Sequence, residues 1–395
     1  MAEKILIINA GSSSVKSSLF LDGGETFRFQ IEREGSHILA TTMFNNLEEK
    51  HSIEEEKFIN ALETVISALY KSRAISHLDE LQGVGFRVVH GGDLFTETVL
   101  LDPVVIQKLH TLDTLAPLHN PPSLKIIEAW FDLKLTVPAF AIFDTAFHTT
   151  IPVIAKTYAI PKALREKFGI HKYGFHGISC ASIVHSFAPN IPPKLIVCHL
   201  GSGASVTAIQ NGESVDTSMG MTPLEGIIMR TRAGDMDPGA VLELVKDLGG
   251  SGSVGEAVHS AERVLNSDSG FKALSGGIDD MREIVKQAQE GNTQCLETVE
   301  IYAYHVAKYI GSYFVVLGGC DALVFTAGTG EGSVFVREKI LAHLSALGIH
   351  FSQEKNNQAL HGNVEIQSTA SHTKIFVLHT EEMQEMCREV QTALK

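Results

Sequence analysis

Two short glycine- and serine-rich turns, about half a chain apart, restrict the possible folds of this sequence more than any other feature. Each turn ends a segment that begins with an apolar, strand-like run, over residues 5–14 and residues 195–203. The two turns align at an offset of 190 residues, which pairs Asn9 with His199, Gly11 with Gly201 and Ser12 with Ser202. Glycine allows a ligand to approach the backbone and serine adds a hydrogen-bond donor, so such turns are typical of phosphate binding. The chain is therefore predicted to be duplicated around two nucleotide-binding turns.

The residues after each turn predict the type of turn. Residues 15–20 and 206–209 are again apolar and β-branched, so each turn is predicted to join two strands of a hairpin. The sequence contains no P-loop motif, and no Rossmann glycine motif opens a helix after the first strand. A third glycine-rich turn is expected over residues 326–331, after a strand-like run at 323–325. Each turn taken alone is equally compatible with an ordinary tight hairpin.

Hairpin turns in two duplicated halves resemble those of the actin, hexokinase and Hsp70 ATPase superfamily. This resemblance implies an α/β fold built of duplicated ribonuclease-H-like (actin-like ATPase) domains with a cleft between them.

The composition is that of a globular enzyme. Of the 395 residues, 44% are hydrophobic and 20% are charged, which is ordinary for such proteins. No run approaches the ~18 apolar residues of a membrane span, and the opening apolar run is too short for a signal peptide, so a cytoplasmic protein without a membrane partner is expected. The net charge of −14 argues against a nucleic-acid partner. The five scattered cysteines form no Cys-x-x-Cys pair and predict neither a disulfide framework nor a zinc site.

The order of strand and helix patterns predicts two domains. The first comprises residues 1–150 together with about 381–395, and the second, residues 151–380, is expected to carry most of the nucleotide site. Helices are predicted at 52–75, 103–112, from a Ser123 cap to 131, 238–248, 254–263, 293–316 and from 381 to the end, and buried strands at 84–89, 139–143 and 373–378.

Two arginines occupy segments that suit anion binding. Arg87 lies in a strand that runs into a double glycine, and the period of two in a strand predicts that Arg87 and Val89 share a face. A guanidinium there could clamp a carboxylate or a phosphate, or it could form only a surface salt bridge. Arg232 lies in a loop marked by Gly-Asp and Asp-Pro dipeptides, where Asp237 is expected to cap the following helix.

Two carboxylates follow strands at positions that could hold a metal. Asp144 comes directly after the apolar run 139–143, and the carboxyl end of such a strand is where α/β sheets bind ligands. It could hold Mg²⁺ or orient a nucleophile, or it could form an Asx-turn. Glu381 follows Thr380 at the start of the last helix; it could bind Mg²⁺, while Thr380 with the acids could be no more than an N-terminal cap.

Two histidines lie in loops rather than on apolar faces. His176 is flanked by glycines at 174 and 177, and His119 is flanked by prolines at 117 and 121. An imidazole can donate a hydrogen bond to a phosphoryl oxygen and stabilise the charge of a transferring group. No His-x-x-x-His or His/Cys cluster supports a metal reading, and each histidine alone could equally be structural.

These segments together resemble the acetate kinase family from the first strand to the last helix. The matching motifs are residues 9–16 (NAGSSSVK), 117–121 (PLHNP), 143–148 (FDTAFH), 174–177 (GFHG), 219–226 (MGMTPLEG) and 325–328 (FTAG). The resemblance implies reversible transfer of the γ-phosphoryl group of ATP to acetate, which gives acetyl phosphate and ADP through in-line attack by the carboxylate. It also implies a homodimer and a Mg²⁺ cofactor, for which Mn²⁺ could substitute.

The resemblance also assigns roles to individual residues. The implied catalytic residues are Arg87, Arg232, His176, His119, His199 and Asp144. The implied metal site consists of Asn9, Asp144 and Glu381. The implied acyl pocket consists of Arg87, Val89, Leu118, Phe175 and Pro223. The implied ATP site consists of Ser12, Lys16, His199, Gly201, Ser202, Gly203, Ala204, Asp280, Met281, Arg282, Gly328, Thr329, Gly330 and Glu331.

Four positions depart from the family pattern without removing a charged catalytic group. Phe86 replaces a usual histidine, Ser202 and Gly332 replace usual asparagines, and Arg230 replaces a common glycine. Ser202 reaches less far than asparagine, so we expect any difference in nucleotide affinity or preference to begin there. Two alternatives remain open: a propionate or butyrate kinase of the same family, and a non-kinase ATPase module of the actin or Hsp70 type.

Overall fold

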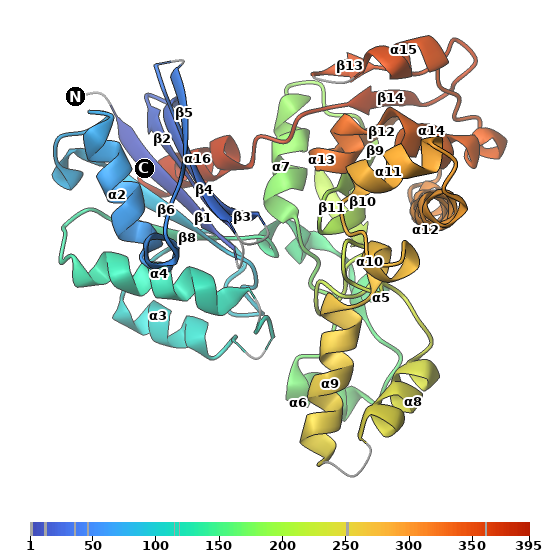
Figure 1. Ribbon diagram of the computed structural model, residues 1–395, viewed down its shortest axis with the longest axis horizontal. Helices are drawn as coiled ribbons and strands as arrows, with labels where there is room; N and C mark the ends of the chain where they lie inside the picture. The colour runs from blue at the N-terminus through green and yellow to red at the C-terminus, as the bar shows by residue number, and fades with distance from the viewer. Residues whose placement is uncertain are drawn as a thin grey trace. The chain divides into compact units, whose positions relative to one another are not determined.

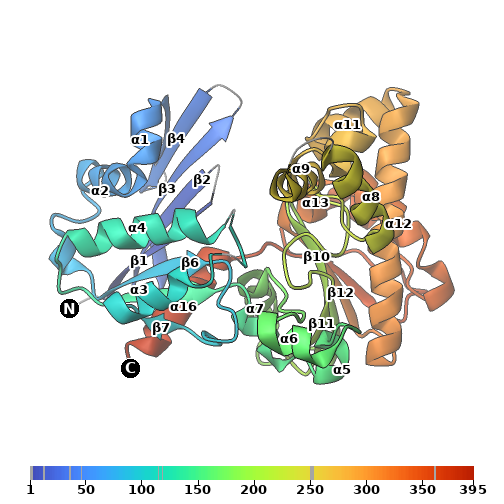
Figure 2. The same cartoon turned by 90° about the horizontal axis from the view of Figure 1, so that it is seen from below.

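The computed structural model describes residues 3–11, 14–34, 37–45, 47–113, 115–117, 119–249, 253–359 and 362–395. The chain folds into two compact units, shown in Figures 1 and 2. Unit 1 consists of residues 1–147, 177–182 and 381–395, and unit 2 consists of residues 148–176 and 183–380. The short segment 177–182, at the start of one helix, therefore belongs to the first unit although the chain on both sides of it belongs to the second.

Unit 1 is built on an eight-stranded sheet with the order β5-β4-β3-β2-β1-β6-β8-β7. Its strands are β1 (Lys4–Ala10), β2 (Ser14–Leu21), β3 (Gly24–Glu34), β4 (His37–Phe44), β5 (Leu47–Ser52), β6 (Gly83–Val88), β7 (Val99–Leu100) and β8 (Ala139–Phe143). The hairpin β1-β2 is antiparallel, whereas β1, β6 and β8 run parallel to one another. The strand predicted over 139–143 is confirmed.

Unit 2 is built on a six-stranded sheet with the order β11-β10-β9-β12-β14-β13. Its strands are β9 (Lys194–Leu200), β10 (Ala204–Gln210), β11 (Glu213–Thr217), β12 (Ala322–Thr326), β13 (Val364–Glu365) and β14 (Lys374–Val377). The hairpin β9-β10 is antiparallel, and β9, β12 and β14 are parallel.

The two sheets share one topology. In unit 1 the order β3-β2-β1-β6-β8 has a counterpart in unit 2, β11-β10-β9-β12-β14, with the same parallel and antiparallel pairings. The first two glycine turns join equivalent hairpin strands, β1 to β2 and β9 to β10. The predicted duplication and the predicted α/β class are confirmed.

Each predicted helical segment contains helix in the structure. The helices are α1 (Glu55–Ile59), α2 (Ala61–Lys71), α3 (Pro103–His110), α4 (Asn120–Asp132), α5 (Val153–Lys156), α6 (Lys162–Phe168), α7 (Gly177–Ser186), α8 (Pro238–Gly249), α9 (Val254–Ser267), α10 (Gly270–Leu274), α11 (Met281–Gln289), α12 (Thr293–Leu317), α13 (Ala327–Gly332), α14 (Val334–Ala342), α15 (Gln353–Gln358) and α16 (Glu382–Ala393), with 3₁₀ helices at Leu78–Glu80, Ala146–Thr150 and Ser345–Leu347. Of these, α5, α6, α7, α10, α11, α13, α14 and α15 were not predicted. None of the helices in the described part of the chain has the length and hydropathy needed to cross a membrane.

Three predicted elements differ from the structure. The helix predicted over 52–75 is two helices, because Asn60 leaves the helical region with φ −97° and ψ 49° between α1 and α2. Ser123 does not cap α4, which already begins at Asn120; its hydroxyl instead donates to the carbonyl of Ala10. The third glycine-rich turn is the short helix α13.

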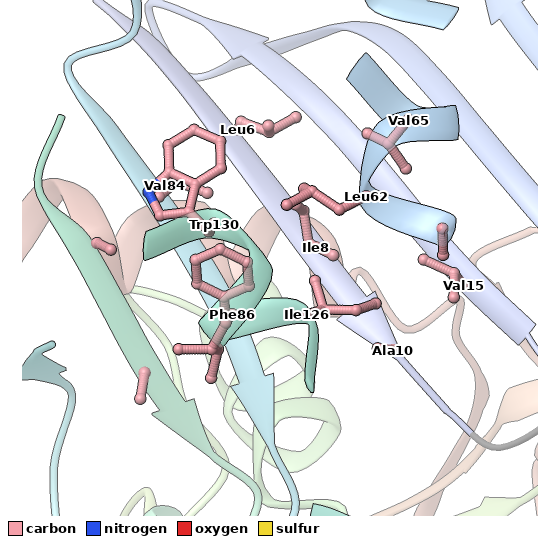
Figure 3. Packing of buried hydrophobic residues seen from close by; sticks show 14 of the residues in the cluster. Leu6, Ile8, Ala10, Val15, Leu62, Val65, Val84, Phe86, Ile126 and Trp130 are labelled. Carbon is pink, nitrogen blue, oxygen red and sulfur yellow. The ribbon is translucent and has the colours of Figure 1, made fainter. Parts of the chain in front are cut away.

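The core of unit 1 lies on both faces of its sheet. On one face, α2 and α4 pack against β1 and β6, as Figure 3 shows for Leu62, Ile126 and Trp130. On the other face, α16 packs its Met386, Cys387 and Val390 against β1, β6 and β8. Both faces are apolar because each strand contributes alternate side chains to each side of the sheet.

Phe86 belongs to the core face of β6. Its ring meets that of Trp130 edge to face, with 6.1 Å between ring centroids, and its side chain is almost fully buried. Its neighbour Arg87 points to the other side of the strand, so the departure from the family pattern at Phe86 is a packing feature.

We predict that Phe86→Ala lowers the free energy of unfolding of unit 1 by about 3–5 kcal/mol, because it removes an aromatic ring from a closed core and leaves a cavity. Denaturant unfolding monitored by the fluorescence of Trp130, the single tryptophan, measures this change. Leu94→Ala is the control, since Leu94 is 56% exposed and should change stability by less than about 0.5 kcal/mol. Equal losses for the two variants would contradict the packing assignment.

Candidate active site

In unit 1 the predicted site residues gather at the carboxyl ends of three parallel strands. The register pairs Ile8 with Phe86 and Val88 with Phe143, so Asn9, Arg87 and Asp144 lie beside one another at the same edge of the sheet. Lys16 stands directly opposite Asn9 on β2 and is exposed. Directly opposed residues of an antiparallel pair share a face, so the lysine extends this polar edge.

Arg87 and Asp144 form a bidentate ion pair at this edge. The Nε and Nη2 atoms of Arg87 donate to the two carboxylate oxygens of Asp144 at 2.8 and 2.5 Å, and Nη1 donates to Oδ1 of Asn9 at 3.1 Å. Asp144 is 1% exposed, whereas Arg87 is only partly buried. Burial opposes the charge of Arg87, but the adjacent Asp144 charge and its hydrogen bonds, with a further contribution from Glu382, outweigh it and raise the pKa of the guanidinium.

The pair engages the whole carboxylate of Asp144, because each of its two oxygens accepts from Arg87. The salt bridge of Arg87 is buried at its carboxylate end rather than on the surface. The pair therefore fixes the direction of the guanidinium.

The backbone after β6 is held by two side chains that sequence reasoning missed. Asn120, which is fully buried, accepts from the backbone N–H of His90 and donates to its carbonyl, both at 3.0 Å. Thr145 accepts from the N–H of Gly91 at 3.1 Å. β6 ends at Val88, one residue before Val89, so the shared face of Arg87 and Val89 stays a prediction. Val89 itself is buried, as an apolar wall requires.

The remaining predicted residues of unit 1 fall into three groups. His119 is half-buried and precedes α4, as its N-cap position, without a capping bond from its side chain. Ser12 and Leu118 lie outside the described residues. Glu381 is exposed, and its N–H donates to the hydroxyl of Ser182 at 2.9 Å.

The start of α16 differs from the predicted cap. Glu381, and not Thr380, is the N-cap residue, and its side chain makes no capping bond to the helix. The charge of the next carboxylate, Glu382, is the one that acts on Arg87. Sequence reasoning missed Glu382, and only its position next to Glu381 could have indicated it.

In unit 2, His176 and His199 form a stacked pair. Their ring centroids are 4.1 Å apart with an angle of 18° between planes. Nδ1 of His176 lies 2.9 Å from the hydroxyl of the buried Ser205 on β10. His176 has a φ of 59°, in the left-handed region that is uncommon for residues other than glycine. A strained backbone of this kind is typical of functional sites.

Arg232 lies close to this histidine pair. A Cβ atom built on Gly203 would lie 3.2 Å from Nε2 of His176 and 3.7 Å from Nη1 of Arg232, so both side chains border the same glycine. Nη1 of Arg232 also donates to the carbonyl of Pro223 at 3.3 Å. Burial lowers the pKa of Arg232. The structure thus brings three predicted residues of unit 2, His176, Arg232 and Gly203, to one place.

The neighbours of Arg232 have structural partners. Arg230 is exposed and pairs with Asp279 at 2.8 Å, so it does not compete with Arg232 for the predicted anion-binding role. Asp237 accepts from the N–H of Gly239 at 2.8 Å, which confirms its predicted cap on α8. Asp235 accepts from the N–H of Gly226 at 2.8 Å and from the hydroxyl of Tyr309 at 2.5 Å, and so connects this loop to α12.

The turn between β9 and β10 carries the predicted phosphate-binding residues 201–204. It is closed by a hydrogen bond from the N–H of Gly201 to the carbonyl of Gly203 at 3.0 Å. Ser202 is exposed at its tip, and its carbonyl accepts from the N–H of Arg230 at 3.2 Å. Ala204 begins β10 and is fully buried.

Residues 327–332 form α13, where the chain leaves β12. Ala327 has a φ of 64°, and Cβ atoms on Gly328 and Gly332 would meet nothing within 4 Å, so this segment is open around both glycines. Glu331 accepts from the N–H of Ala327 at 2.8 Å and pairs with His379 at 2.7 Å. Burial opposes its ionisation, but the hydrogen bond and charge of His379 with two backbone N–H groups lower the pKa of Glu331.

Arg337 fixes this segment from beneath, and sequence reasoning missed it. Its side chain is fully buried, and its donors reach the carbonyls of Gly330 and Glu331 at 2.8 and 2.7 Å. The others reach the side chain and carbonyl of Asn356 and the carbonyl of Ala359. Burial lowers its pKa to about 10. No motif marked this arginine, because its partners are backbone carbonyls that only the fold brings together.

Residues 280–282 form the start of α11. Asp280 caps the helix by accepting from the N–H of Arg282 at 2.8 Å and pairs with the exposed side chain of Arg282 at 2.7 Å. The hydrogen bond from that side chain lowers the pKa of Asp280. Met281 is buried, so Arg282 and the carboxylate are the members of this group that a ligand could reach.

Within the described ranges, no group of three or more His, Cys, Asp or Glu residues could hold a metal ion. Asn9 and Asp144 provide the hard oxygen donors that Mg²⁺ prefers, although both also accept from Arg87. Such a set fits an ion that arrives with phosphate oxygens and water.

The topology and these residues place the chain in a known class and family. The duplicated sheets, each with a hairpin beside its parallel strands, define an actin-like ATPase fold. Residues 4–388 match the model of the acetokinase family. The acetate kinase of Clostridium novyi (strain NT) is 43% identical over 394 residues, with 96% of this chain and 95% of the relative covered.

Two solved structures give the same result. The crystal structure of Porphyromonas gingivalis acetate kinase has a TM-score of 0.88 and 33% identity and covers 100% of both chains. That of a propionate kinase from Francisella tularensis subsp. tularensis SCHU S4 has a TM-score of 0.89 and 34% identity and covers 98% of both chains. The chain belongs to the acetokinase family, as the sequence motifs predicted.

We predict that Arg337→Lys lowers the free energy of unfolding of unit 2 by about 2–4 kcal/mol, since a single ammonium cannot reach carbonyls on both sides of the buried guanidinium. Hydrogen exchange should also become faster at residues 327–332, whose carbonyls lose their donors. Arg263→Lys is the matched control on α9, because Arg263 is 69% exposed. Unchanged stability and exchange in Arg337→Lys would show that Arg337 does not hold this segment.

Proposed function

We propose that this chain transfers the γ-phosphoryl group of ATP reversibly to acetate. A carboxylate oxygen of acetate forms a bond to the γ-phosphorus while the bond from that phosphorus to the β,γ-bridging oxygen breaks, and the electron pair leaves with ADP. The observation that carries the proposal is the convergence of His176 and Arg232 on Gly203, in the turn that the family motif assigns to phosphate. Membership of the acetokinase family supports the acceptor.

The residues of unit 2 have the chemistry that a loose phosphoryl transfer state requires. Such a state needs alignment and neutralisation of charge on the equatorial oxygens, and little covalent work. Arg232 supplies a fixed positive charge, and His176 supplies a donor whose ring is oriented by the hydrogen bond to Ser205. His199 stacks on that ring and restricts its rotation. We assign charge stabilisation to Arg232 and His176 and support to His199 and His119.

In unit 1 we propose that Arg87 binds the carboxylate of acetate or the transferring phosphoryl group. Asp144 chiefly aligns Arg87. The bidentate pair holds the guanidinium plane, so its loss would free the side chain. Lys16, opposite Asn9, adds charge at the same edge.

We propose Mg²⁺ as the cofactor, with Mn²⁺ as a substitute. The ion would be held by Asn9, Asp144 and Glu381, through water where a protein oxygen is already engaged. When bound, the ion neutralises phosphate charge. The nucleotide would contact residues 201–204, the open glycines of α13 and Arg282.

The acyl methyl group is assigned to Val89, Leu118, Phe175 and Pro223. Val89 and Phe175 are buried apolar side chains, as a methyl pocket requires. A pocket discriminates one methylene by only about 1–3 kcal/mol, so propionate should be a poorer but real substrate. The likeness to a propionate kinase at 34% identity makes propionate the second candidate acceptor.

We further propose a homodimer that works in the cytoplasm. Apolar side chains on α5 and α6, among them Ile154, which is 91% exposed, and Phe168, support burial against a second copy.

The proposed reaction predicts acyl phosphate that hydroxylamine converts to a coloured hydroxamate. With ATP and Mg²⁺, kcat/KM for acetate should exceed that for propionate by about 10–200-fold, and butyrate should be slower still. Removal of metal with EDTA should abolish the reaction, and Mg²⁺ or Mn²⁺ should restore it.

Each alternative predicts a different result in that assay. Faster reaction with propionate would identify a propionate kinase and overturn the pocket assignment. Slow ATP hydrolysis that acetate does not affect, without hydroxamate, would indicate the actin- or Hsp70-like ATPase module.

We predict that Arg232→Ala lowers kcat by about 10³-fold or more, because a guanidinium that stabilises a transferring phosphoryl group contributes on that scale. Arg230→Ala is the matched control two residues away: its side chain is exposed and paired with Asp279, so kcat should stay within about threefold. Steady-state kinetics with matched thermal melts measures both variants. Similar kcat values for the two would rule out the role of Arg232.

A further inference from the structure

His148 lies at the centre of contacts that the proposed reaction does not use. It belongs to the 3₁₀ helix Ala146–Thr150, and its side chain is 3% exposed. It contacts Gly174, Phe175 and Ser214 of β11, which belong to unit 2. We infer that His148 is a positioning residue that holds the Phe175–His176 peptide in the geometry phosphoryl transfer needs; this inference rests on the proposed function of His176.

The hydrogen bonds of His148 fix its tautomer. Nε2 lies 2.8 Å from the carbonyl oxygen of Phe175, and a carbonyl only accepts, so Nε2 carries the proton. Nδ1 lies 2.8 Å from the hydroxyl of Ser214, which is fully buried. In a neutral ring Nδ1 is the acceptor, so the Ser214 hydroxyl donates to it. The imidazole is thus a directed donor toward Phe175.

The ring also packs against the backbone of Gly174. A Cβ atom there would lie 2.8 Å from both Cδ2 and Cγ of His148, and 2.6 Å from a methyl group of Thr217. Gly174 has a φ of 80°, so it is constrained both by conformation and by this contact. The ring of His148, from the Phe-Asp-Thr-Ala-Phe-His motif, therefore leaves no room for a side chain at Gly174, the first glycine of the Gly-Phe-His-Gly motif.

The hydrogen bond to the Phe175 carbonyl controls the orientation of the peptide group before His176, and with it the direction of the His176 side chain. The carbonyl of Phe175 and the N–H of His176 belong to one planar peptide group, so a hydrogen bond to the oxygen fixes the plane for both residues. His176 then adopts its left-handed φ of 59°, which a histidine does not favour without external restraint. His148 restrains the backbone before His176, and Ser205 restrains its ring.

A matched pair of substitutions separates the donor from the rest of the side chain. His148→Gln places an amide nitrogen near the position of Nε2 and can still donate to Phe175, whereas His148→Asn places its amide near Nδ1 and cannot reach that carbonyl. His148→Asn should lower kcat by about 10–100-fold, because a small misplacement of a catalytic group has this effect, while KM for ATP stays within about threefold. His148→Gln should recover at least half of that loss on a logarithmic scale.

A double-mutant cycle tests whether His148 acts through His176. In a His176→Ala background, His148→Asn should lower kcat by less than about threefold further, since the positioned side chain is already absent. Each of three outcomes would overturn the inference. They are full additivity of the two losses, equal losses in His148→Asn and His148→Gln, and a kcat of His148→Asn within threefold of the parent. His259→Asn, at a histidine whose side chain is 84% exposed, controls for the substitution itself.

The same cycle distinguishes failure of this inference from failure of the proposed function of His176. Normal kcat in His176→Ala would refute the proposed role of His176, whereas a large loss in His176→Ala with no loss in His148→Asn would refute only the role of His148. If His148→Asn does not fold, Ser214→Ala removes only the bond to Nδ1. Its kcat should fall several-fold with unchanged KM for ATP, and unchanged kcat would count against the inference.

Discussion

Parallel pairing of three strands in each unit is the constraint from which the rest of the structure follows. Because β1, β6 and β8 run in one direction, their carboxyl ends meet at one edge, and Asn9, Arg87 and Asp144 are neighbours although they are far apart in the chain. In unit 2, β9, β12 and β14 place His199 and the start of α13 at the equivalent edge. The antiparallel hairpin beside each set supplies the glycine turn. The same topology used twice produces one set of polar residues in each unit.

The three important arginines of the molecule differ in how their charge is compensated. Arg87 is paired with a buried carboxylate, which raises its pKa and holds its plane. Arg337 has no acidic partner among its described contacts; carbonyls satisfy its donors, and burial lowers its pKa to about 10. Arg232 donates to the carbonyl of Pro223, and burial lowers its pKa.

The sequence predicted the fold class, the duplication and the family because these depend on local patterns. Apolar runs ending in glycine turns, and motifs at fixed order, are visible without tertiary contacts. The residues that hold the site could not be found in this way. Asn120, His148 and Arg337 each bond a backbone group more than twenty residues away, those of His90, Phe175 and Ala359, and the identity of such partners appears only when the chain has folded. The error at Ser123 has the same origin, since its hydroxyl prefers the carbonyl of Ala10 to a cap.

The departures from the family pattern fall into two physical kinds. Phe86 is enclosed by the core and packs on Trp130, so its side chain is part of the stability of unit 1. Ser202 and Gly332 instead lie at exposed positions, and a Cβ at Gly332 would meet no atom within 4 Å. A shortened side chain in open space leaves the packing of the fold unchanged. The consequence of these two departures must therefore fall on what approaches the turn at 201–203 and α13 from outside, which is the nucleotide in the proposed reaction.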